Sequence, residues 1–396
     1  AKLGQAGQNL VRRIGSRSGF GATVSVLNWN DDGRADIVLS SPGAFDFSVA
    51  GDFDTAAVVF SGNSLWTSNA PDALAIITTD ETSVDALLGT VFPGATWLSS
   101  ASRFRNSSFT VTVAGDVDGD GRDDLVIADR GAATVAVPNG QQVSVGRAYV
   151  LTSRSSQHLN DAETIIQDLS FGASVSALGD LNRDGYDDFA IGRTVETRIP
   201  DAGAGTGPGA LAREGGLFVY LGGTRFAAST QLQLQPADAD IIVSRQSHDE
   251  AAEGFSQTGT LRATAGDFDG DGRQDLVVGE TASSLRAAGG TTTLDQSSRG
   301  AVWMFFDVAR RGHTLSLESA NPGSDANDAD VRIGGQFELD QFGTLSATPR
   351  VDLNDDGIDD LVVGAAAADL VGARPIVGAG RVFVAYGAGR PPALPA

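Results

Sequence analysis

Short apolar runs rich in β-branched residues alternate along the chain with polar segments rich in Gly, Asp and Ser. Five of these runs directly follow an acidic segment, and they occupy residues 36–39, 124–127, 188–191, 275–278 and 360–363. Short β-branched runs bounded by Gly and Asp are typical of buried strands. We therefore predict a buried strand immediately after each acidic segment.

Other strand patterns recur around these five runs. An apolar strand is expected before each acidic segment, and a third strand follows later, usually after a Gly, at residues 57–60, 146–151, 216–221, 300–306 and 380–386. Segments such as 231–234 and 314–317 alternate apolar with polar residues, which predicts a half-exposed fourth strand. Repeated units of four antiparallel strands are the pattern of β-propeller blades, which bury their faces by packing in a ring.

The two ends of the chain are expected to meet. The last repeat stops soon after its third strand, whereas residues 9–15, which lead to Phe20-Gly21, resemble residues 330–334, which lead to Phe342-Gly343. Residues 1–19 should therefore supply the closing strand of the last blade. The sequence predicts an all-β fold, with one β-propeller domain over residues 1–396 and five blades favoured over six or seven.

The acidic segments share one nine-residue pattern, with Asp or Asn at positions 1, 3 and 5, Gly at position 6 and Asp at position 9. Alternate side chains of a tightly wound loop can point at one cation, and Ca²⁺ takes about six to eight oxygen ligands, including backbone carbonyls. The residue at position 7 would supply its carbonyl, and the Gly permits a sharp turn. The predicted ligands are Asn28, Asn30, Asp32, Arg34 and Asp36; Asp116, Asp118, Asp120, Arg122 and Asp124; Asp180, Asn182, Asp184, Tyr186 and Asp188; Asp267, Asp269, Asp271, Arg273 and Asp275; and Asp352, Asn354, Asp356, Ile358 and Asp360.

Two other interpretations of these loops are weaker. An EF-hand needs a Glu at position 12, where this chain has only apolar residues, and it needs flanking helices. Hairpin turns rich in Asp and Gly do not require acids at four fixed positions. Up to five Ca²⁺ ions are therefore predicted. Ligand charge predicts the tightest binding at loops 116–124 and 267–275, weaker binding at 180–188 and 352–360, and the weakest at 28–36.

The repeats resemble the FG-GAP repeat family, known from the N-terminal β-propeller of integrin α subunits. Phe20-Gly21, Phe171-Gly172 and Phe342-Gly343 match the FG element, whereas Phe255-Ser256 and Phe109-Thr110 depart from it. Ser41-Pro42-Gly43-Ala44 and Gly364-Ala365-Ala366 retain part of the GAP element. The resemblance covers roughly residues 8–386, and it implies a calcium-binding propeller whose ligands bind on the face opposite the calcium loops.

Composition narrows the classes of partner. The formal charge of −22 disfavours nucleic acid and anionic membranes, and there is no Cys and no apolar run long enough to cross a membrane. A chain that starts at Ala1 rather than Met suggests a processed or trimmed product. Together with the calcium loops, these features predict an extracellular or cell-surface location, where Ca²⁺ is plentiful.

Long insertions mark the expected ligand face, at residues 41–55, 81–108, 129–145, 193–215, 280–299 and 365–379. Long loops on a rigid scaffold are common places for binding. We expect an adhesion, recognition or assembly module that binds a protein, a glycan or further copies of itself. The alternative is a polysaccharide-active or other secreted enzyme with catalytic residues in these insertions, although the sequence singles out no catalytic group.

Overall fold

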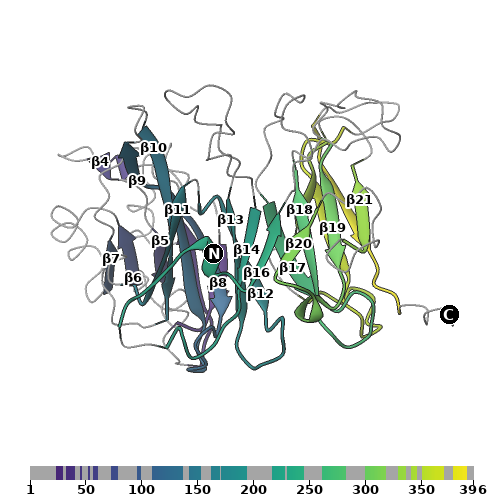
Figure 1. The fold of residues 1–396 in the computed structure, drawn as a ribbon, viewed down its shortest axis with the longest axis horizontal. Coiled ribbons are helices and arrows are strands. Elements are labelled where there is room, and N and C mark those ends of the chain that lie inside the picture. Colours follow the sequence, from purple (N-terminus) through teal and green to yellow (C-terminus); the bar gives the residue numbers. More distant parts are fainter. Residues whose placement is uncertain are drawn as a thin grey trace, which may run out of the picture. The chain divides into compact units, whose positions relative to one another are not determined.

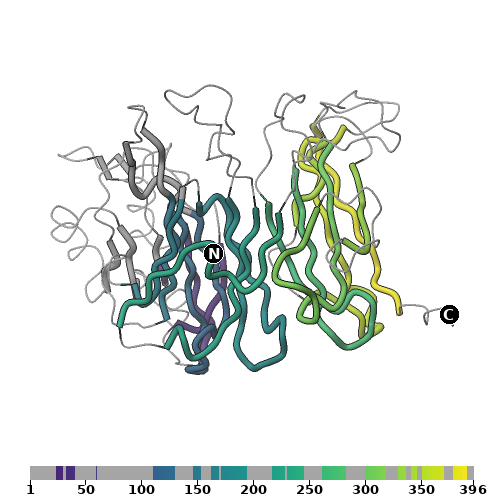
Figure 2. Tube along the Cα trace, in the orientation of Figure 1, coloured from purple at the N-terminus to yellow at the C-terminus, as the bar shows by residue number. Residues whose placement is uncertain are grey.

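The computed structural model describes the strands and many of the loops that join them (Figures 1 and 2). The described residues are 24–29, 33–40, 45–46, 52–53, 57–60, 73–78, 96–99, 109–136, 142–152, 162–169, 171–193, 216–227, 230–244, 261–281, 299–317, 329–335, 340–345, 350–369 and 378–389. Their contacts divide the chain into two compact units. Unit 1 comprises residues 1–175 and 222–238, and unit 2 comprises residues 176–221 and 239–396.

Unit 1 contains two five-stranded sheets and a small hairpin. The first sheet consists, in spatial order, of β1 (Val24–Leu27), β2 (Asp36–Ser40), β5 (Ala57–Phe60), β6 (Ala73–Thr78) and β7 (Thr96–Ser99), and the hairpin of β3 (Phe45–Asp46) and β4 (Asp52–Phe53). The second sheet consists of β8 (Phe109–Gly115), β9 (Asp124–Ala136), β10 (Gln142–Leu151), β11 (Thr164–Leu169) and β15 (Leu232–Leu234).

Unit 2 contains three sheets. The first consists of β12 (Ser174–Gly179), β13 (Asp188–Arg193), β14 (Gly216–Tyr220), β16 (Ile241–Ser244) and β20 (Thr314–Ser316). The second consists of β17 (Leu261–Gly266), β18 (Asp275–Glu280), β19 (Ala301–Phe305) and β21 (Val331–Gly334), and the third of β22 (Phe342–Leu345), β23 (Leu361–Ala365) and β24 (Arg381–Ala385). Short 3-10 helices occupy η2 (Pro236–Asp238), which belongs to unit 1, and η3 (Val308–Arg310).

The five sheets that carry an acidic loop are built on the same plan, which confirms the strands predicted on either side of these loops. The first strand pairs antiparallel with the second across the loop, and the second pairs antiparallel with the third. All six residues of the second strand β18 are buried, and so are all residues of the third strands β14 and β19. The second strands β2 and β23 alternate between buried and half-buried positions. The apolar runs after the acidic loops therefore form inner strands of these sheets.

Each unit has its own clusters of buried apolar residues. In unit 1, Leu27, Val38, Leu125 and Tyr149 belong to one buried cluster. In unit 2, one cluster surrounds Trp303 with residues of the first two sheets, and another joins residues of the second and third sheets. Within each unit, neighbouring sheets thus bury faces that neither sheet could bury alone.

The predicted fourth strands were wrong in their pairing. Residues 232–234 (β15) and 314–316 (β20) form fifth strands, which pair in parallel with β11 and β16 of the preceding repeat. The antiparallel fourth strands of the third and fourth repeats are instead β16 and β21, which follow later in the chain. An alternating pattern shows that a strand is half-exposed, but it does not show which edge the strand joins.

The insertion predicted at residues 129–145 is also partly regular structure. Strands β9 and β10 continue past the edge of their sheet, and residues 133–136 of one pair with residues 142–145 of the other. This extension projects upward in Figure 1, from the end of the sheet opposite loop 116–124.

The all-β prediction is confirmed, with an antiparallel core in every sheet of the described residues. The closing strand predicted within residues 1–19 lies outside the described residues, as do Phe20-Gly21 and Phe255-Ser256. The described part of the chain contains no helix with the length and hydrophobicity needed to span a bilayer.

Candidate calcium loops

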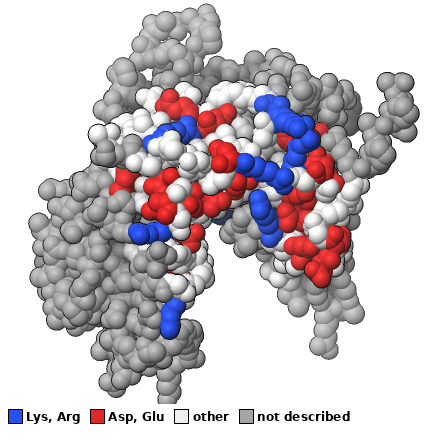
Figure 3. Space-filling model, turned by 90° about the horizontal axis from the view of Figure 1, so that it is seen from below, with Lys and Arg blue, Asp and Glu red and all other residues white. Residues whose placement is uncertain are grey.

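Each acidic loop joins the first and second strands of one sheet, as the sequence predicted. Four loops are described completely, at residues 116–124, 180–188, 267–275 and 352–360. In the loop at 28–36, the predicted ligands Asn28, Arg34 and Asp36 are described, whereas Asn30 and Asp32 lie outside the described residues. The face of the molecule shown in Figure 3 carries several groups of acidic side chains with Arg side chains among them.

The Asp at position 9 anchors every loop to its sheet. Its Oδ2 accepts a hydrogen bond from the backbone N–H of position 2, over 2.7–3.1 Å, in the pairs Trp29–Asp36, Val117–Asp124, Leu181–Asp188, Phe268–Asp275 and Leu353–Asp360. All five carboxylates are almost completely buried. Burying an ionised carboxylate is costly unless hydrogen bonds or a cation compensate it. The hydrogen bond from position 2 offsets part of this cost in all five loops.

The carboxylate at position 1 and the Gly at position 6 close each completely described loop. The Gly N–H donates to Oδ2 of the Asp over 2.8–3.0 Å, as from Gly121 to Asp116 and from Gly357 to Asp352. The Gly residues have φ between 76° and 92°, a conformation that a Cβ disfavours. A Cβ at Gly121 or Gly357 would meet no atom within 4 Å, so backbone conformation alone requires Gly there.

Positions 3 and 5 complete the winding of the loop. Oδ1 at position 3 accepts the N–H of position 5, and Oδ1 at position 5 accepts the N–H of position 7, as in the series Asp118, Asp120 and Arg122. The other three completely described loops make the same two bonds over 2.8–3.1 Å. The side chains predicted as ligands therefore converge within each loop.

Loops 116–124 and 267–275 bring their acids close enough to share an ion. Carboxylate oxygens of Asp116, Asp118 and Asp120 lie within 4.8 Å of one another, and so do those of Asp267, Asp269 and Asp275. At 180–188 and 352–360, position 3 is Asn, and its Nδ2 donates to the Asp at position 5 over 2.9 Å. An Asn gives a cation one neutral oxygen in place of a charged one.

The acids of loop 267–275 fit a hard cation. Oδ1 of Asp267 is buried and accepts no hydrogen bond from the described residues, although an unsatisfied buried oxygen is costly. Asp269 is 4% exposed, and burial raises the pKa of Asp275 to about 7. Burial likewise raises the pKa of Asp118 in loop 116–124. Ca²⁺ requires several carboxylate oxygens close together. Asp267, Asp269 and Asp275 supply them, and Oδ1 of Asp267 has no hydrogen-bond donor among the described residues.

The side chain of Arg273 forms ion pairs that the loop sequence did not predict. It was predicted to contribute only its backbone carbonyl, but its guanidinium lies 3.1 Å from Oδ2 of Asp271 and 2.9 Å from Oδ1 of Asp307. Asp307 follows the third strand β19 and has a positive φ of 52°. Arg273 therefore holds a predicted calcium ligand in an ion pair, and no pattern within the nine-residue loop indicates this partner.

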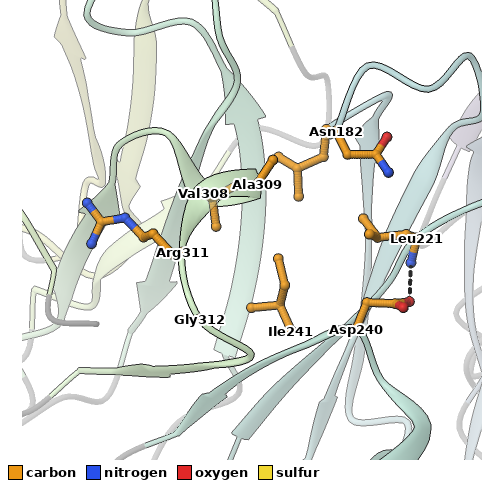
Figure 4. A pocket seen from close by; sticks show the side chains of 9 residues that line it. Asn182, Leu221, Asp240, Ile241, Val308, Ala309, Arg311 and Gly312 are labelled. Atoms are coloured by element: carbon orange, nitrogen blue, oxygen red, sulfur yellow. Dashed lines mark hydrogen bonds between the residues drawn. The ribbon is translucent and has the colours of Figure 1, made fainter. Parts of the chain in front are cut away.

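A shallow hollow of about 230 Å³ lies in unit 2, next to loop 180–188 (Figure 4). Its lining is part apolar, from Leu181, Leu221, Ile241, Val308 and Ala309, and part polar, and its remaining lining residues are Asn182, Asp240, Arg311 and Gly312. The polar groups are engaged within the protein: Asp240 accepts the N–H of Leu221, and Arg311 pairs with Asp330. In Figure 4 the Arg311 side chain is directed away from the hollow.

The ligand face predicted from the insertions falls mostly on residues that the structure does not describe. This applies to most of 41–55, to 194–215, to 282–298 and to 370–377. The assignment of a ligand to this face therefore remains a prediction.

Comparisons with known proteins identify the repeats. The model of the FG-GAP-like repeat matches residues 116–191, and the model of the FG-GAP repeat matches residues 261–303. Both matched segments contain a complete acidic loop and its flanking strands. These two segments are therefore similar to FG-GAP repeats, as the residue pattern of the chain predicted.

Two curated relatives align over much of the chain. Integrin alpha-5 of Xenopus laevis is 28% identical over 291 residues, which are 70% of this chain and 22% of the relative. Phosphatidylinositol-glycan-specific phospholipase D of Mus musculus is 29% identical over 248 residues, 59% of this chain and 23% of the relative. The chain thus spans less than a quarter of the length of either protein.

Among solved structures, the rhamnogalacturonan lyase YesW aligns with 85% of this chain and 58% of its own. The sequence identity is 13% and the TM-score is 0.32.

Proposed function

We propose that this chain is a calcium-binding β-propeller that acts outside the cell as an adhesion, recognition or assembly module. The observation that carries the calcium assignment is the buried carboxylate group of Asp267, Asp269 and Asp275 around an Asp267 oxygen that accepts no hydrogen bond from the described residues. The repetition of one hydrogen-bond scheme in the other loops extends the proposal to all five.

In each loop the residues at positions 1, 3, 5 and 9 would hold the ion through side-chain oxygens, and position 7 through its carbonyl. A bound Ca²⁺ would supply two positive charges that offset the mutual repulsion of the loop carboxylates. The protein's own contribution is visible in loop 267–275: the hydrogen bonds of Gly272, Phe268 and Arg273 fix three carboxylates before any ion arrives. Part of the folding stability should therefore depend on calcium.

A closed ring of five blades is the arrangement that we propose for the sheets. Two strands at opposite ends of the series support it. Val24 and Val26 of β1 are 61% and 60% exposed, and Val382 and Val384 of β24 are 71% and 44% exposed. Large exposed apolar groups on strands usually mark surfaces that another element covers. We propose that residues 1–19 pair beside β24 and that the first and last blades cover each other's exposed residues.

The proposed partner is a protein or a glycan, bound by the insertions opposite the calcium loops, with self-assembly as a further possibility within the same class. Support comes from the alignment with integrin alpha-5 over 70% of this chain. The extension of β9 and β10 beyond their sheet, at the end opposite loop 116–124, is one paired strand element on that side of the sheet. Long loops on a rigid scaffold are suited to such binding.

A secreted enzyme is the second candidate function, and the alignment with a phospholipase D favours it. It would place catalytic residues in the insertions, for which the described residues provide no assigned group. Turnover of glycosylated phosphatidylinositol and of polysaccharides by the purified chain would favour the enzyme over the binding module.

The calcium proposal is tested by counting metal ions and by thermal unfolding. Native mass spectrometry of the full chain is expected to show up to five bound Ca²⁺ ions, and EDTA is expected to lower Tm strongly. Asp269→Ala is expected to remove one ion, whereas Asp238→Ala, an acid of η2 outside all the loops, should leave the count unchanged. A chain without calcium whose Tm is insensitive to EDTA would overturn the proposal.

A further inference from the structure

Neighbouring acidic loops are joined by the residue at position 8, which the calcium pattern does not use. In unit 2, Oδ2 of Asp359 accepts a hydrogen bond from the backbone N–H of Asp267 over 2.8 Å. The backbone N–H of Asp359 donates in return to the carbonyl oxygen of Asp267 over 3.0 Å. Position 8 of loop 352–360 is thus bonded twice to position 1 of loop 267–275.

The same connection occurs in unit 1. Oδ2 of Asp123, at position 8 of loop 116–124, accepts the N–H of Asn28 over 2.6 Å. Asn28 is position 1 of loop 28–36. Two pairs of loops, in separate units, therefore share one arrangement, in which a later loop holds the first ligand residue of the loop before it.

Position 8 is placed to transmit the occupation of one loop to the next. Asp359 stands between Ile358, whose carbonyl is a proposed ligand, and Asp360, whose carboxylate is another. An ion in loop 352–360 would fix the backbone on both sides of Asp359. The Asp359 carboxylate would then hold Asp267 more rigidly, so the next ion would meet a ligand that is already ordered.

The absence of a side chain at Gly266 leaves room for the Asp359 carboxylate. A Cβ on Gly266 would lie 3.1 Å from both Cβ and Oδ2 of Asp359, closer than nearly all real contacts of that kind. Asp360 adds a further anchor, because its Oδ1 accepts the N–H of Gly387 over 2.9 Å. The segment around Asp359 is therefore packed tightly against loop 267–275.

Loop 267–275 lacks such a carboxylate of its own. Its position 8 is Gln274, which is 4% exposed and whose Oε1 accepts no hydrogen bond from the described residues. Gln274 provides an internal comparison, because it occupies the same position in its loop and makes no hydrogen bond to another loop among the described residues.

We propose that Asp359 and Asp123 are positioning residues that couple the calcium affinities of neighbouring loops, joining 352–360 to 267–275 and 116–124 to 28–36. The inference rests on the proposed function, because it requires that the loops bind calcium. It goes further by assigning a role to two acids outside the ligand set and by predicting which loops fill cooperatively.

The test is a calcium titration of the full chain by isothermal calorimetry, with the ions counted by native mass spectrometry. Asp356→Ala removes a position 5 carboxylate from loop 352–360. In the wild-type background it is expected to eliminate one ion and to weaken a second by at least about fivefold, the lower end of usual coupling between sites. In an Asp359→Ala background it should eliminate one ion and leave the remaining affinities unchanged.

Two further variants separate coupling from a loss of folding. Asp359→Asn keeps an oxygen that can accept the Asp267 N–H, so it is expected to restore the coupling that Asp359→Ala removes. Gln274→Ala changes position 8 of the other loop, and Asp356→Ala should weaken the second ion in this background as it does in the wild type. Both variants are compared at equal folded fraction by circular dichroism.

The possible failures can be told apart. A wild-type chain that binds no calcium overturns the proposed function together with this inference. A chain that binds calcium, but loses a single ion without any change in the other affinities on Asp356→Ala, overturns the coupling alone. Coupling that persists in Asp359→Ala assigns the transmission to other residues and also overturns the role of Asp359.

Discussion

The carbonyl oxygen of Phe171 lies 1.8 Å from the point that a Cβ on Gly146 would occupy. The same relationship joins Phe342 to Gly300, where the distance is 1.7 Å. Gly146 lies within the third strand β10 and Gly300 directly precedes the third strand β19, and in both pairs the Phe begins the next repeat with its side chain buried. The Phe-Gly element is therefore a packing device, which lets the chain enter a new repeat against the backbone of the previous one.

Replacing Gly146 by Ala should destabilise unit 1 strongly. Because the obstructing atom is a backbone oxygen, either β10 or the segment at Phe171 must shift, and such overpacking costs typically about 1–3 kcal/mol or more. Urea unfolding in saturating calcium measures the change. Gly389→Ala is the control, since a Cβ there would meet no atom within 4 Å. Equal stability of the two variants would contradict the packing role.

Replacing Gly357 by Ala should weaken its loop through the backbone alone. Gly357 has a φ of 83° and open space around its Cβ position, so the left-handed conformation is the only obstacle. That conformation costs a residue with a Cβ about 1–2 kcal/mol. Asn adopts it more readily, so Gly357→Asn should lose less stability and less calcium affinity than Gly357→Ala. Denaturant unfolding and calorimetry on both variants provide the comparison, and the reverse order would refute the explanation.

Loops 116–124 and 267–275 should bind calcium more tightly than 180–188 and 352–360. The first two present three mutually close carboxylates, whereas the latter two have Asn at position 3. Asp118→Asn is expected to reduce the affinity of its loop, and Asn182→Asp to raise the affinity of loop 180–188. Calorimetric titration of the two single variants with Ca²⁺ measures both changes in affinity. Affinities that are independent of this position would show that charge count does not set the order.

Removing the Arg273 side chain should raise the calcium affinity of loop 267–275. Arg273 pairs with Asp271, so an ion must compete with the guanidinium for this carboxylate. Arg273→Ala releases Asp271 while leaving the position 7 carbonyl in place. Arg122→Ala is the matched control in loop 116–124. The hydrogen bond from the Arg122 backbone N–H to Asp120 does not depend on the side chain and is retained in this variant. A fall in affinity in Arg273→Ala would mean that the ion pair positions Asp271 for the ion.

Deleting residues 1–19 should lower Tm and promote self-association. In the proposed ring, β24 loses its neighbouring strand when this segment is deleted. Val382 in β24 and Tyr386 directly after it are 71% and 64% exposed. An uncovered strand edge is a template for pairing with another chain. Light scattering and thermal unfolding of the shortened chain test the closure. A monomer with unchanged Tm would exclude residues 1–19 as the closing strand.

Much of the fold could be predicted because its main constraints are local. The strand after each loop follows from a β-branched run, and the loop follows from residues within nine positions. The buried Asp at position 9 illustrates this point: one residue both ends the acidic pattern and starts the strand. The second and third strands were therefore placed correctly from sequence alone.

Other features depend on residues that are distant in the sequence. The parallel pairing of β20 with β16 involves segments about 70 residues apart, and nothing in the alternation of residues 314–317 specifies its partner. The bond between Asp359 and Asp267 spans 92 residues and uses a position that the ligand pattern leaves free. Such contacts become visible only once neighbouring repeats are packed together.

The assignment of residues 222–238 to unit 1 has a consequence for how this protein can be divided. The chain leaves unit 2 after Leu221, contributes β15 to a sheet of unit 1, and returns to unit 2 at Ala239. Neither unit is a continuous stretch of sequence, so no single cut yields an intact half. The third and fourth repeats cannot be gained, lost or transplanted as self-contained segments, because excising either one would remove β15 or β20 from the sheet of the preceding repeat.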